Sequence, residues 1–363
     1  MRHLELFAGI GGFRRAIDLF CKDNNEKAYC VGFSEIDKHA VLSYKAMYET
    51  DGEIELGDIQ KFVADKRLNE LPSFDLLTGG FPCQSFSMMG KKRGFKDERG
   101  EVFYRIIDIL NQSNPKYILL ENVRNLKNHD KGKTYNEVIR SLTEDANYEV
   151  DSIILNTKDF GLPQTRRRLF IFGIHRKYLK KDQTIKLNHD DVLSVSSMLN
   201  RETSLNYYQN VLDGVLNRKA NQIYYLSEQV KPTILANGSK SFNSKSEINQ
   251  MIARPLTASM AKMHRACQDN YYSDEFLSAP NPEEYLKQTF TKKDLENHRI
   301  RRITPEEAFK LQGLNNEDIE RAKKAGVSNH QLYKQAGNAV SVNTVYAFLN
   351  YLNLKFKILG EKK

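Results

Sequence analysis

The chain has 363 residues, of which 40% are hydrophobic and 28% charged. This composition is ordinary for a globular protein, and the length allows a large compact unit with a smaller one beside it. No apolar run approaches the ~20 residues needed to cross a bilayer, so we expect neither a membrane span nor a signal peptide.

The cysteines and the charge narrow the chemistry further. The four cysteines, Cys21, Cys30, Cys83 and Cys267, form no CxxC pair and are not densely spaced. This spacing argues against a disulfide framework and a zinc site, and it predicts a reducing, cytoplasmic setting. The net charge of +9 is typical of a protein with a polyanionic partner, although a merely basic surface explains it equally well.

A strand, a glycine turn and a helix open the chain. Residues 4–7 have a strand pattern, the turn AGIGG follows at residues 8–12, and residues 13–20 repeat apolar side chains at helical spacing. This order lets a nucleotide-like ligand approach the backbone and a helix N-terminus. Glycine turns also serve plain strand–helix packing, so the signal is weak by itself.

Carboxylates follow the next two predicted strands. Glu35 comes after a strand at residues 28–33, and Asp58 comes after a short strand at residues 53–56. A carboxylate after the second strand can accept both ribose hydroxyls of a nucleotide-like ligand, and Asp58 can accept from an adenine amino group. Each carboxylate alone is more often a solvated loop residue, but together they favour an adenosine pocket.

Two further strands end at a cysteine and a glutamate. Residues 74–78 lead through two glycines to Cys83, residues 117–120 lead to Glu121, and a helical pattern at 102–110 lies between them. Alternating strands and helices predict an α/β fold with a doubly wound, mostly parallel sheet, and ligands bind beyond the carboxyl ends of such strands. The residues expected to meet at this edge are Phe7, Glu35, Asp58, Cys83 and Glu121.

An arginine-rich segment precedes the last strand of the first half. A strand is expected at residues 153–155, and the segment QTRRR at 164–168 leads into an apolar strand that ends at Gly173. Alternation along a strand puts Arg166 and Arg168 on one face and the arginine between them on the other. Two guanidinium groups on one face can hold a phosphate or a carboxylate, with solvated surface arginines as the alternative.

The second half is polar and carries few motifs. Residues 237–244 have loop composition, and the segment 264–271 contains side-chain types that read base edges, Arg for guanine and Asn or Gln for adenine. The candidate readers are Arg265, Gln268 and Asn270. A small mixed domain with a polar surface is the alternative, and the sequence contains neither a zinc pattern nor an internal repeat.

In order and approximate spacing, these motifs resemble those of one family, the DNA (cytosine-5)-methyltransferases of the bacterial and phage restriction-modification type. The resemblance runs from residue 4 to about residue 345 and lacks a family pattern only between about 175 and 300. The segments that carry it are FAGIGG (7–12), Glu35, GDI (57–59), GGFPCQ (79–84), ENV (121–123), QTRRR (164–168), RITPEE (302–307), LQG (311–313) and QAGNAV (335–340).

The resemblance implies a class I S-adenosylmethionine-dependent, Rossmann-like fold with a second, smaller target-recognition domain. It places the catalytic domain at residues 1–176 and 330–363 and the target-recognition domain, with its returning hinge segment, at residues 177–329. S-adenosylmethionine is the implied methyl donor, and S-adenosylhomocysteine is the product. The residues implied to bind the donor are Phe7, Gly9, Gly11, Gly12, Glu35, Ile36, Asp58, Ile59, Pro82, Asn338 and Ala339.

The resemblance also assigns catalytic roles to Cys83, Glu121, Arg166 and Arg168. By residue type alone Cys83 is a buried thiol, but in this family it would attack C6 of cytosine as a thiolate and so activate C5. Glu121 would contact N3 and the exocyclic amine, a role that suits a carboxyl group whose pKa burial has raised. Arg166 would orient the base. The sequence does not identify a residue that accepts the C5 proton.

Reaching C6 inside a duplex requires flipping the nucleotide out of the helix. The glycine-punctuated stretch 85–100 is expected to close over the DNA, with Met89 filling the gap that the base leaves or simply packing within the loop. Thr233 fits a threonine–apolar pair that family members carry in the recognition region. The other residues expected to contact DNA are Gln84, Ser87, Lys91, Lys92 and Arg93.

The resemblance implies duplex DNA as the partner, no metal, no membrane, and a monomer without a stable complex to any cognate restriction endonuclease. Three alternatives remain open. An RNA enzyme of the same mechanism would methylate tRNA, and its relatives typically lack a recognition region this long. The other two are a catalytically silent DNA-binding relative, against which the intact Cys83, Glu121 and Arg166 argue, and a dinucleotide-dependent oxidoreductase, which would bind NAD.

Overall fold

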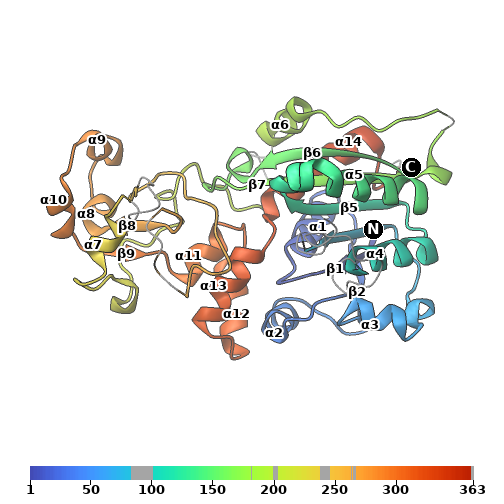
Figure 1. Cartoon of the computed structure of the whole chain (residues 1–363), viewed down its shortest axis with the longest axis horizontal. Helices are drawn as coiled ribbons and strands as arrows, with labels where there is room; N and C mark the ends of the chain where they lie inside the picture. Colours follow the sequence, from blue (N-terminus) through green and yellow to red (C-terminus); the bar gives the residue numbers. More distant parts are fainter. Residues whose placement is uncertain are drawn as a thin grey trace.

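The computed structural model describes residues 1–82, 101–180, 182–198, 203–237, 246–262, 264 and 267–360. The described chain forms a large unit around a seven-stranded sheet and a smaller unit beside it (Figure 1). Both chain ends lie in the large unit. The helices drawn between the two units are α11 (Pro305–Lys310), α12 (Asn316–Lys324) and α13 (Asn329–Asn338).

The large sheet has the strand order β3-β2-β1-β4-β5-β7-β6 within the described residues. Its strands are β1 (Arg2–Leu6), β2 (Tyr29–Phe33), β3 (Ile54–Glu55), β4 (Leu76–Gly80), β5 (Tyr117–Val123), β6 (Tyr148–Asn156) and β7 (Arg167–His175). β1 to β5 run parallel, whereas β7 pairs antiparallel with both β5 and β6. The mostly parallel α/β fold is confirmed, with one reversed strand that the sequence pattern does not reveal.

The central strands are apolar on both faces because helices cover both faces. In β5, Leu119 and Leu120 are both fully buried. Alternate residues point to opposite faces, so Leu119 packs in one core with Phe170 of β7, and Leu120 packs in the other core with Leu169. This alternation decides which polar side chains at the strand ends share a face.

Helices from distant parts of the chain cover each face. One core contains residues of α1 (Gly12–Asp23), α2 (Lys38–Met47), α6 (His189–Met198) and α14 (Val342–Phe356). The other contains residues of α3 (Ile59–Ala64), α4 (Glu101–Ser113) and α5 (Lys133–Arg140). Because α14 packs against α1, the C-terminal segment lies beside the N-terminal segment in the large unit.

Short turns of 3-10 or π-helix connect several of these elements. They are η1 (Arg67–Glu70), η3 (Arg124–Gly132), η4 (Ser141–Asp145), η5 (Thr157–Phe160), η6 (Arg176–Tyr178) and, in the smaller unit, η7 (Gln222–Tyr224). η3 follows β5 directly and packs against α5 and β7. It therefore lies on the face of the sheet that α5 covers.

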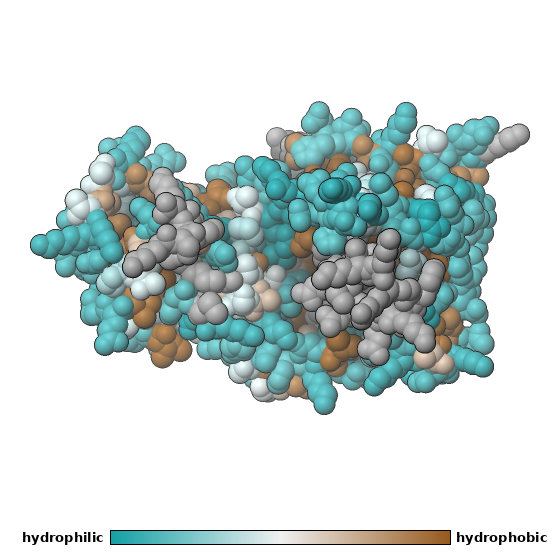
Figure 2. Space-filling view, viewed as in Figure 1, coloured by the Kyte–Doolittle hydropathy of each residue, from teal (hydrophilic) through white to brown (hydrophobic). Residues whose placement is uncertain are grey.

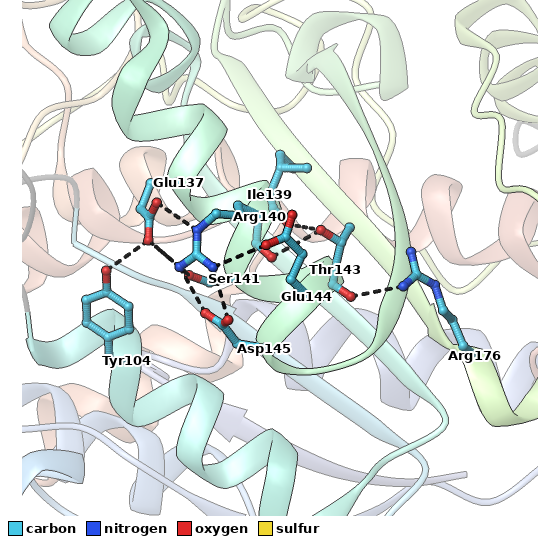
Figure 3. A network of polar contacts seen from close by, with 9 residues as sticks. All are labelled: Tyr104, Glu137, Ile139, Arg140, Ser141, Thr143, Glu144, Asp145 and Arg176. Atoms are coloured by element: carbon cyan, nitrogen blue, oxygen red, sulfur yellow. Dashed lines mark hydrogen bonds and ion pairs between the residues drawn. The ribbon is translucent and has the colours of Figure 1, made fainter.

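Arg140, the last residue of α5, binds neighbouring carboxylate groups (Figure 3). Its guanidinium group donates to Glu137 at 2.7 Å and to both oxygens of Asp145 at 3.0 Å. Nearby, Arg176 pairs with Glu149 at 3.2 Å. The arginine charges in this part of the large unit are therefore balanced within the protein.

The smaller unit contains a two-stranded antiparallel sheet of β8 (Tyr271–Ser273) and β9 (Ile300–Arg302). Its short helices are α7 (Lys231–Ile234), α8 (Asp274–Leu277), α9 (Pro282–Lys287) and α10 (Lys292–Glu296). After β9, Pro305 opens α11 as expected, and Thr304 and Glu307 form a capping box. Glu307 also forms a fully buried ion pair with Arg301 at 2.8 Å, which ties this helix start to β9.

The helix α6 belongs to the large unit by its contacts. It packs against α14 and β6, and its Val192 lies in the same core as Phe348 of α14. The division into two domains stays a prediction.

Candidate functional site

Four strands of the large sheet end at one edge, and the candidate residues follow them. The parallel register pairs Glu5 with Phe33, Leu6 with Gly79 and Gly80 with Glu121. Phe7, Glu35 and Glu121 therefore lie along this edge, with Asp58 following β3, the neighbour of β2. The predicted residues Cys83, Gln84, Ser87, Met89, Lys91, Lys92 and Arg93 lie outside the described residues.

The turn after β1 is shaped by left-handed backbone. Phe7 has φ 54°, and Gly9 and Gly11 have φ 56° and 75°. A non-glycine residue in this region is strained, and such strain concentrates at functional sites. A Cβ on Gly12 would lie 2.7 Å from the Val340 carbonyl oxygen, so only glycine lets α1 start this close to the segment that follows α13.

Glu35 is fixed by backbone N–H groups rather than by a cation. One carboxylate oxygen accepts from the Gly9 N–H at 2.8 Å, and the other accepts from the N–H groups of Ile36 and Asp37, each at 2.8 Å. A carboxylate offers about four lone-pair sites, so one remains for a ligand hydroxyl. Beside it the Ile36 side chain is 75% exposed, an apolar surface next to a fixed acceptor.

The other predicted donor-binding residues differ in what they offer. Asp58 caps α3, with one carboxylate oxygen accepting from the Gln60 N–H at 2.9 Å. The Ile59 side chain is buried in the core, so only its backbone can reach a ligand. Asn338 ends α13 with an exposed side chain, and Pro82 is exposed at the carboxyl end of β4.

Glu121 faces Arg168 across the ladder between β5 and β7. The Arg168 Nε lies 2.9 Å from a Glu121 oxygen, and both side chains are mostly buried. Burial raises the pKa of Glu121, while the positive charges of Arg168 and Arg166 oppose that rise. Gly80 lies beside it in the ladder, where a Cβ would come within 3.4 Å of a Glu121 carboxylate oxygen.

Arg166 has a different environment from the one expected. Its guanidinium group is buried and donates to the carbonyl oxygens of Leu256, Gly337 and Ala339 at 2.9–3.1 Å. Burial and the charge of Arg168 lower its pKa. Arg168 is thus the arginine that pairs with Glu121, and Arg166 joins three segments that are distant in sequence. Base orientation by Arg166 stays a prediction.

Asn122 positions the backbone that leads to the cysteine. Its side-chain amide donates to the Phe81 carbonyl oxygen at 2.8 Å, and its own oxygen accepts from the Val123 N–H at 2.8 Å. Phe81 lies two residues before Cys83 in the chain. The side chain after Glu121 therefore fixes the end of the neighbouring strand, a role that sequence reasoning missed.

The segment 253–258 is a second feature that sequence reasoning missed. Ala253 exchanges backbone hydrogen bonds with Pro163 and Thr165 at 2.7 and 2.9 Å, and the Leu256 N–H donates to Gln164 at 3.0 Å. Through these bonds, the segment 253–258 is attached to the arginine-rich motif QTRRR, which leads into β7. The one sequence feature that relates to this contact is Gly337, which lies in the family segment QAGNAV. A Cβ at residue 337 would lie 2.2 Å from the Thr257 carbonyl carbon.

The candidate base readers are only partly supported. Asn270 is buried, and its amide oxygen and nitrogen both bond the Arg254 backbone, at 2.7 and 3.2 Å. The expectation that Asn270 reads a base edge is therefore wrong, since its hydrogen-bonding groups hold the protein backbone. Gln268 and Thr233 are exposed and stay candidates, and Arg265 lies outside the described residues.

Two other kinds of site were searched for in the described part of the chain. It contains no group of three or more His, Cys, Asp or Glu side chains that could hold a metal ion. No helix within it is long and apolar enough to cross a membrane.

Comparison with known proteins gives a consistent result. A family model described as C-5 cytosine-specific DNA methylase matches residues 1–353. The chain is 36% identical to the type II methyltransferase M1.ScrFI of Lactococcus lactis subsp. cremoris, over 95% of this chain and 76% of that protein. It is 31% identical to the orphan methyltransferase M.SPRI of Bacillus phage SPR, over 97% of each.

The fold has relatives of known structure. The S. pombe Dnmt2 methyltransferase matches with a TM-score of 0.69 and 21% identity, over 98% of this chain and 99% of that one. The Entamoeba histolytica methyltransferase EhMeth matches with a TM-score of 0.69 and 19% identity, over 99% of each. These likenesses concern the fold, while the family model and the curated relatives identify the sequence. The chain belongs to the C-5 cytosine-specific DNA methylase family.

Proposed function

We propose that this protein transfers a methyl group from S-adenosylmethionine to C5 of a flipped-out cytosine in a specific duplex DNA sequence. The observation that carries the proposal is the buried Glu121–Arg168 pair at the carboxyl edge of the sheet, beside the strand that leads to Cys83. A carboxyl group held there by an arginine suits the recognition of a cytosine edge, which offers N3 and an exocyclic amine.

The residues at the first two strand ends fit an adenosine-type donor. Glu35 keeps one acceptor site for a ribose hydroxyl, and the exposed Ile36 offers an apolar surface for a flat ring. The left-handed turn at Gly9 and Gly11 supports close approach of the donor to the backbone. When bound, S-adenosylmethionine supplies an electrophilic methyl group.

Cys83 is proposed as the nucleophile. Its thiolate forms a bond to C6, which moves electron density to C5 so that C5 can take the methyl group. Loss of the C5 proton and elimination of the thiolate then restore the aromatic ring and the free cysteine. The fixed end of β4, held through the Asn122 bond to the Phe81 carbonyl, supports this role because it limits the backbone freedom before Cys83.

Glu121 is proposed to share a proton with N3 of the cytosine. The raised pKa of this buried carboxyl group favours its protonated form, which can donate to N3 as negative charge develops on the ring. Arg168 holds the carboxyl group in place and limits the rise of its pKa. Arg166 is proposed as a positioning residue that acts through the backbone of residues 256 and 337–339.

The proposal extends to the biological setting. Relatives named as type II and orphan methyltransferases support a modification enzyme, either of a restriction-modification system or of a phage without a partner nuclease. Action as a cytoplasmic monomer belongs to the same proposal. So do DNA contacts by Gln84, Ser87, Lys91, Lys92 and Arg93 and gap filling by Met89.

A transfer assay tests the function and separates it from the RNA alternative. Protein, methyl-labelled S-adenosylmethionine and unmethylated plasmid DNA are incubated, with bulk tRNA in a parallel reaction. We expect label in DNA only, recovered as 5-methylcytosine after nucleoside digestion and located at one short sequence by bisulfite sequencing. Label in tRNA alone, or in another nucleoside, would contradict the proposal.

A further inference from the structure

Four exposed basic side chains lie on the α5 face of the sheet, around the end of β5. They are Arg124, Lys131, Lys133 and Arg167, and together they are called the basic rim. Arg124 and Lys131 belong to η3, and Lys133 begins α5. Arg167 is the first residue of β7 and lies on the same face of that strand as Leu169. Leu169 packs in the core that α5 covers. Figure 2 shows a hydrophilic surface over α5 in this view.

The register brings two arginines of this rim next to each other. β5 and β7 are antiparallel, and Val123 pairs with Arg168 as the last residue of β5. One step further along each strand lie Arg124 and Arg167. Arg124 begins η3, so no strand pairing joins it to Arg167, but both like charges lie at the same end of the neighbouring strands β5 and β7.

The charges of the basic rim differ from those elsewhere on the same face. Arg140 and Arg176 are each bound to carboxylates, as Figure 3 shows for Arg140. None of the four rim side chains has an ion-pair partner among the residues that the structure describes. These like charges therefore lie uncompensated at the carboxyl edge of the sheet, on the α5 face, whereas Glu121 and Arg168 lie on the other face of the same edge.

The backbone of the rim is also strained. Asp130 and Lys131 have φ 47° and 56°, and Gly132 has φ 85°, so three consecutive residues adopt the left-handed conformation. Left-handed conformations at non-glycine residues cost of order 1–3 kcal/mol each, so the surrounding structure must hold this turn in place. The His129 ring bonds the Thr134 hydroxyl at 2.6 Å across this turn and closes it. The turn thus holds Lys131 in one position at the end of η3.

We propose that the basic rim binds backbone phosphates of the duplex beside the target cytosine. The inference rests on the proposed function and adds the surface that positions the DNA. Arg124 follows Glu121 by three residues, about 10 Å along a strand, and one DNA strand carries a phosphate per ~3.4 Å of helix axis. Phosphates next to the target therefore come within reach of Arg124 and Arg167, and they relieve the repulsion between these side chains.

The salt dependence of DNA binding tests the rim directly. The affinity for a 30-base-pair duplex of arbitrary sequence is measured by fluorescence anisotropy at a series of salt concentrations. The slope of log K against log salt is negative, and each lost phosphate contact should decrease its steepness by about 0.9. We expect this decrease for Lys131→Asn and for Arg167→Gln, and about twice that decrease for the double variant Arg124→Gln/Arg167→Gln.

A matched control is available at Lys66. This lysine is also exposed and left-handed, with φ 58° and ψ 31° against 56° and 33° for Lys131, but it follows α3 on the way to the start of β4. Asparagine tolerates the left-handed region, so Lys66→Asn and Lys131→Asn both remove charge without new strain. Lys66→Asn should leave the slope and the methyl transfer rate unchanged.

The outcomes separate the rim from the proposed function. If the wild type methylates DNA and all rim variants keep its slope, the rim proposal is wrong and the function stands. If the wild type transfers no methyl group to DNA, the proposed function fails, and the rim proposal falls with it. A decrease in thermal stability for Arg167→Gln would also contradict the rim, since removing one of two adjacent unpaired charges should not destabilise the fold.

Discussion

At the scale of single residues, opposing effects set the protonation of the Glu121 carboxyl group. Burial favours the protonated form, and the neighbouring arginines favour the ionised form. Glu121→Gln keeps the shape but cannot exchange a proton with N3. We expect the methyl transfer rate to fall by about 10²- to 10⁴-fold, the usual contribution of a positioned acid or base. Donor affinity, measured by calorimetry with S-adenosylmethionine, should stay the same because Glu35 is unaltered.

Glu149→Gln is the matched control for this prediction. It removes another glutamate of the same sheet that pairs with an arginine, at 3.2 Å from Arg176, but near the start of β6 and away from the candidate site. The methyl transfer rate of Glu149→Gln should equal that of the wild type. Equal rates for Glu121→Gln and Glu149→Gln would contradict the role of Glu121.

Two buried groups of β1 give a pH dependence of stability. Burial lowers the pKa of His3 from 6.5 to about 3, and burial raises the pKa of Glu5 from 4.5 to about 8. Between pH 4.5 and 6.5 the unfolded chain carries the proton on His3 and the folded chain carries it on Glu5, so the two effects cancel. From pH 6.5 to about 8 only the folded state holds a proton at this pair, so these groups lower stability as pH rises.

Glu5→Gln should change this profile in a defined way. In the wild type the two groups contribute a slope of up to about −1.4 kcal/mol per pH unit between pH 6.5 and 8 to the free energy of unfolding. In Glu5→Gln that slope disappears, and the uncompensated His3 makes stability rise with pH below 6.5. Urea denaturation across this range measures both slopes, and identical profiles for the two proteins would contradict the account.

Residue roles could be predicted only where they depend on position along a strand. The arrangement of Glu35 and Glu121 along one edge follows from strand order and from the rule that parallel strands share their carboxyl edge. The different partners of Arg166 and Arg168 could not be predicted, because the carbonyl groups that bind Arg166 lie 90 to 173 residues away. The same holds for Asn270, whose amide is engaged by a backbone 16 residues earlier.

At the scale of elements, α13 packs closely against the segment 253–258. Gly337→Ala should favour helix formation locally, since alanine is the better helix former by about 1 kcal/mol. Its Cβ would nevertheless lie 2.2 Å from the Thr257 carbonyl carbon. We therefore expect a net destabilisation of about 1–3 kcal/mol in thermal unfolding.

His330→Ala provides the control on the same helix. His330 is exposed at the start of α13, so its substitution tests helix propensity without the contact. Its stability should change by less than about 0.5 kcal/mol. A Gly337→Ala protein as stable as the wild type would show that the close approach to residue 257 is unimportant.

Elements with strong local signals are the ones that sequence reasoning located. The apolar spacing at residues 13–20 and 102–110 predicted the helices α1 and α4 from the sequence alone. The reversed direction of β7 and the docking of 253–258 could not be located, because both depend on long-range pairing rather than on local pattern.

At the scale of the whole molecule, Arg166 joins the sheet to segments that are distant in the chain. The large unit supplies the strand ends with Glu35 and Glu121, and the segment 253–258 and α13 are joined to it through Arg166. The net charge of +9 and the basic rim place positive charge where duplex DNA is proposed to bind. Glu35, the Glu121–Arg168 pair and the strand that leads to Cys83 thus lie along one edge of the large sheet.

The most direct measurement of the central claim is the capture of the covalent intermediate. Duplex DNA with 5-fluorocytosine at the methylated position cannot lose the C5 substituent, so the thiolate bond to C6 persists once the methyl group has been transferred. The account predicts a protein–DNA adduct, stable in denaturing gel electrophoresis and dependent on S-adenosylmethionine, for the wild type and none for Cys83→Ser. An adduct of equal yield with Cys83→Ser, or no adduct with an active wild type, would contradict it.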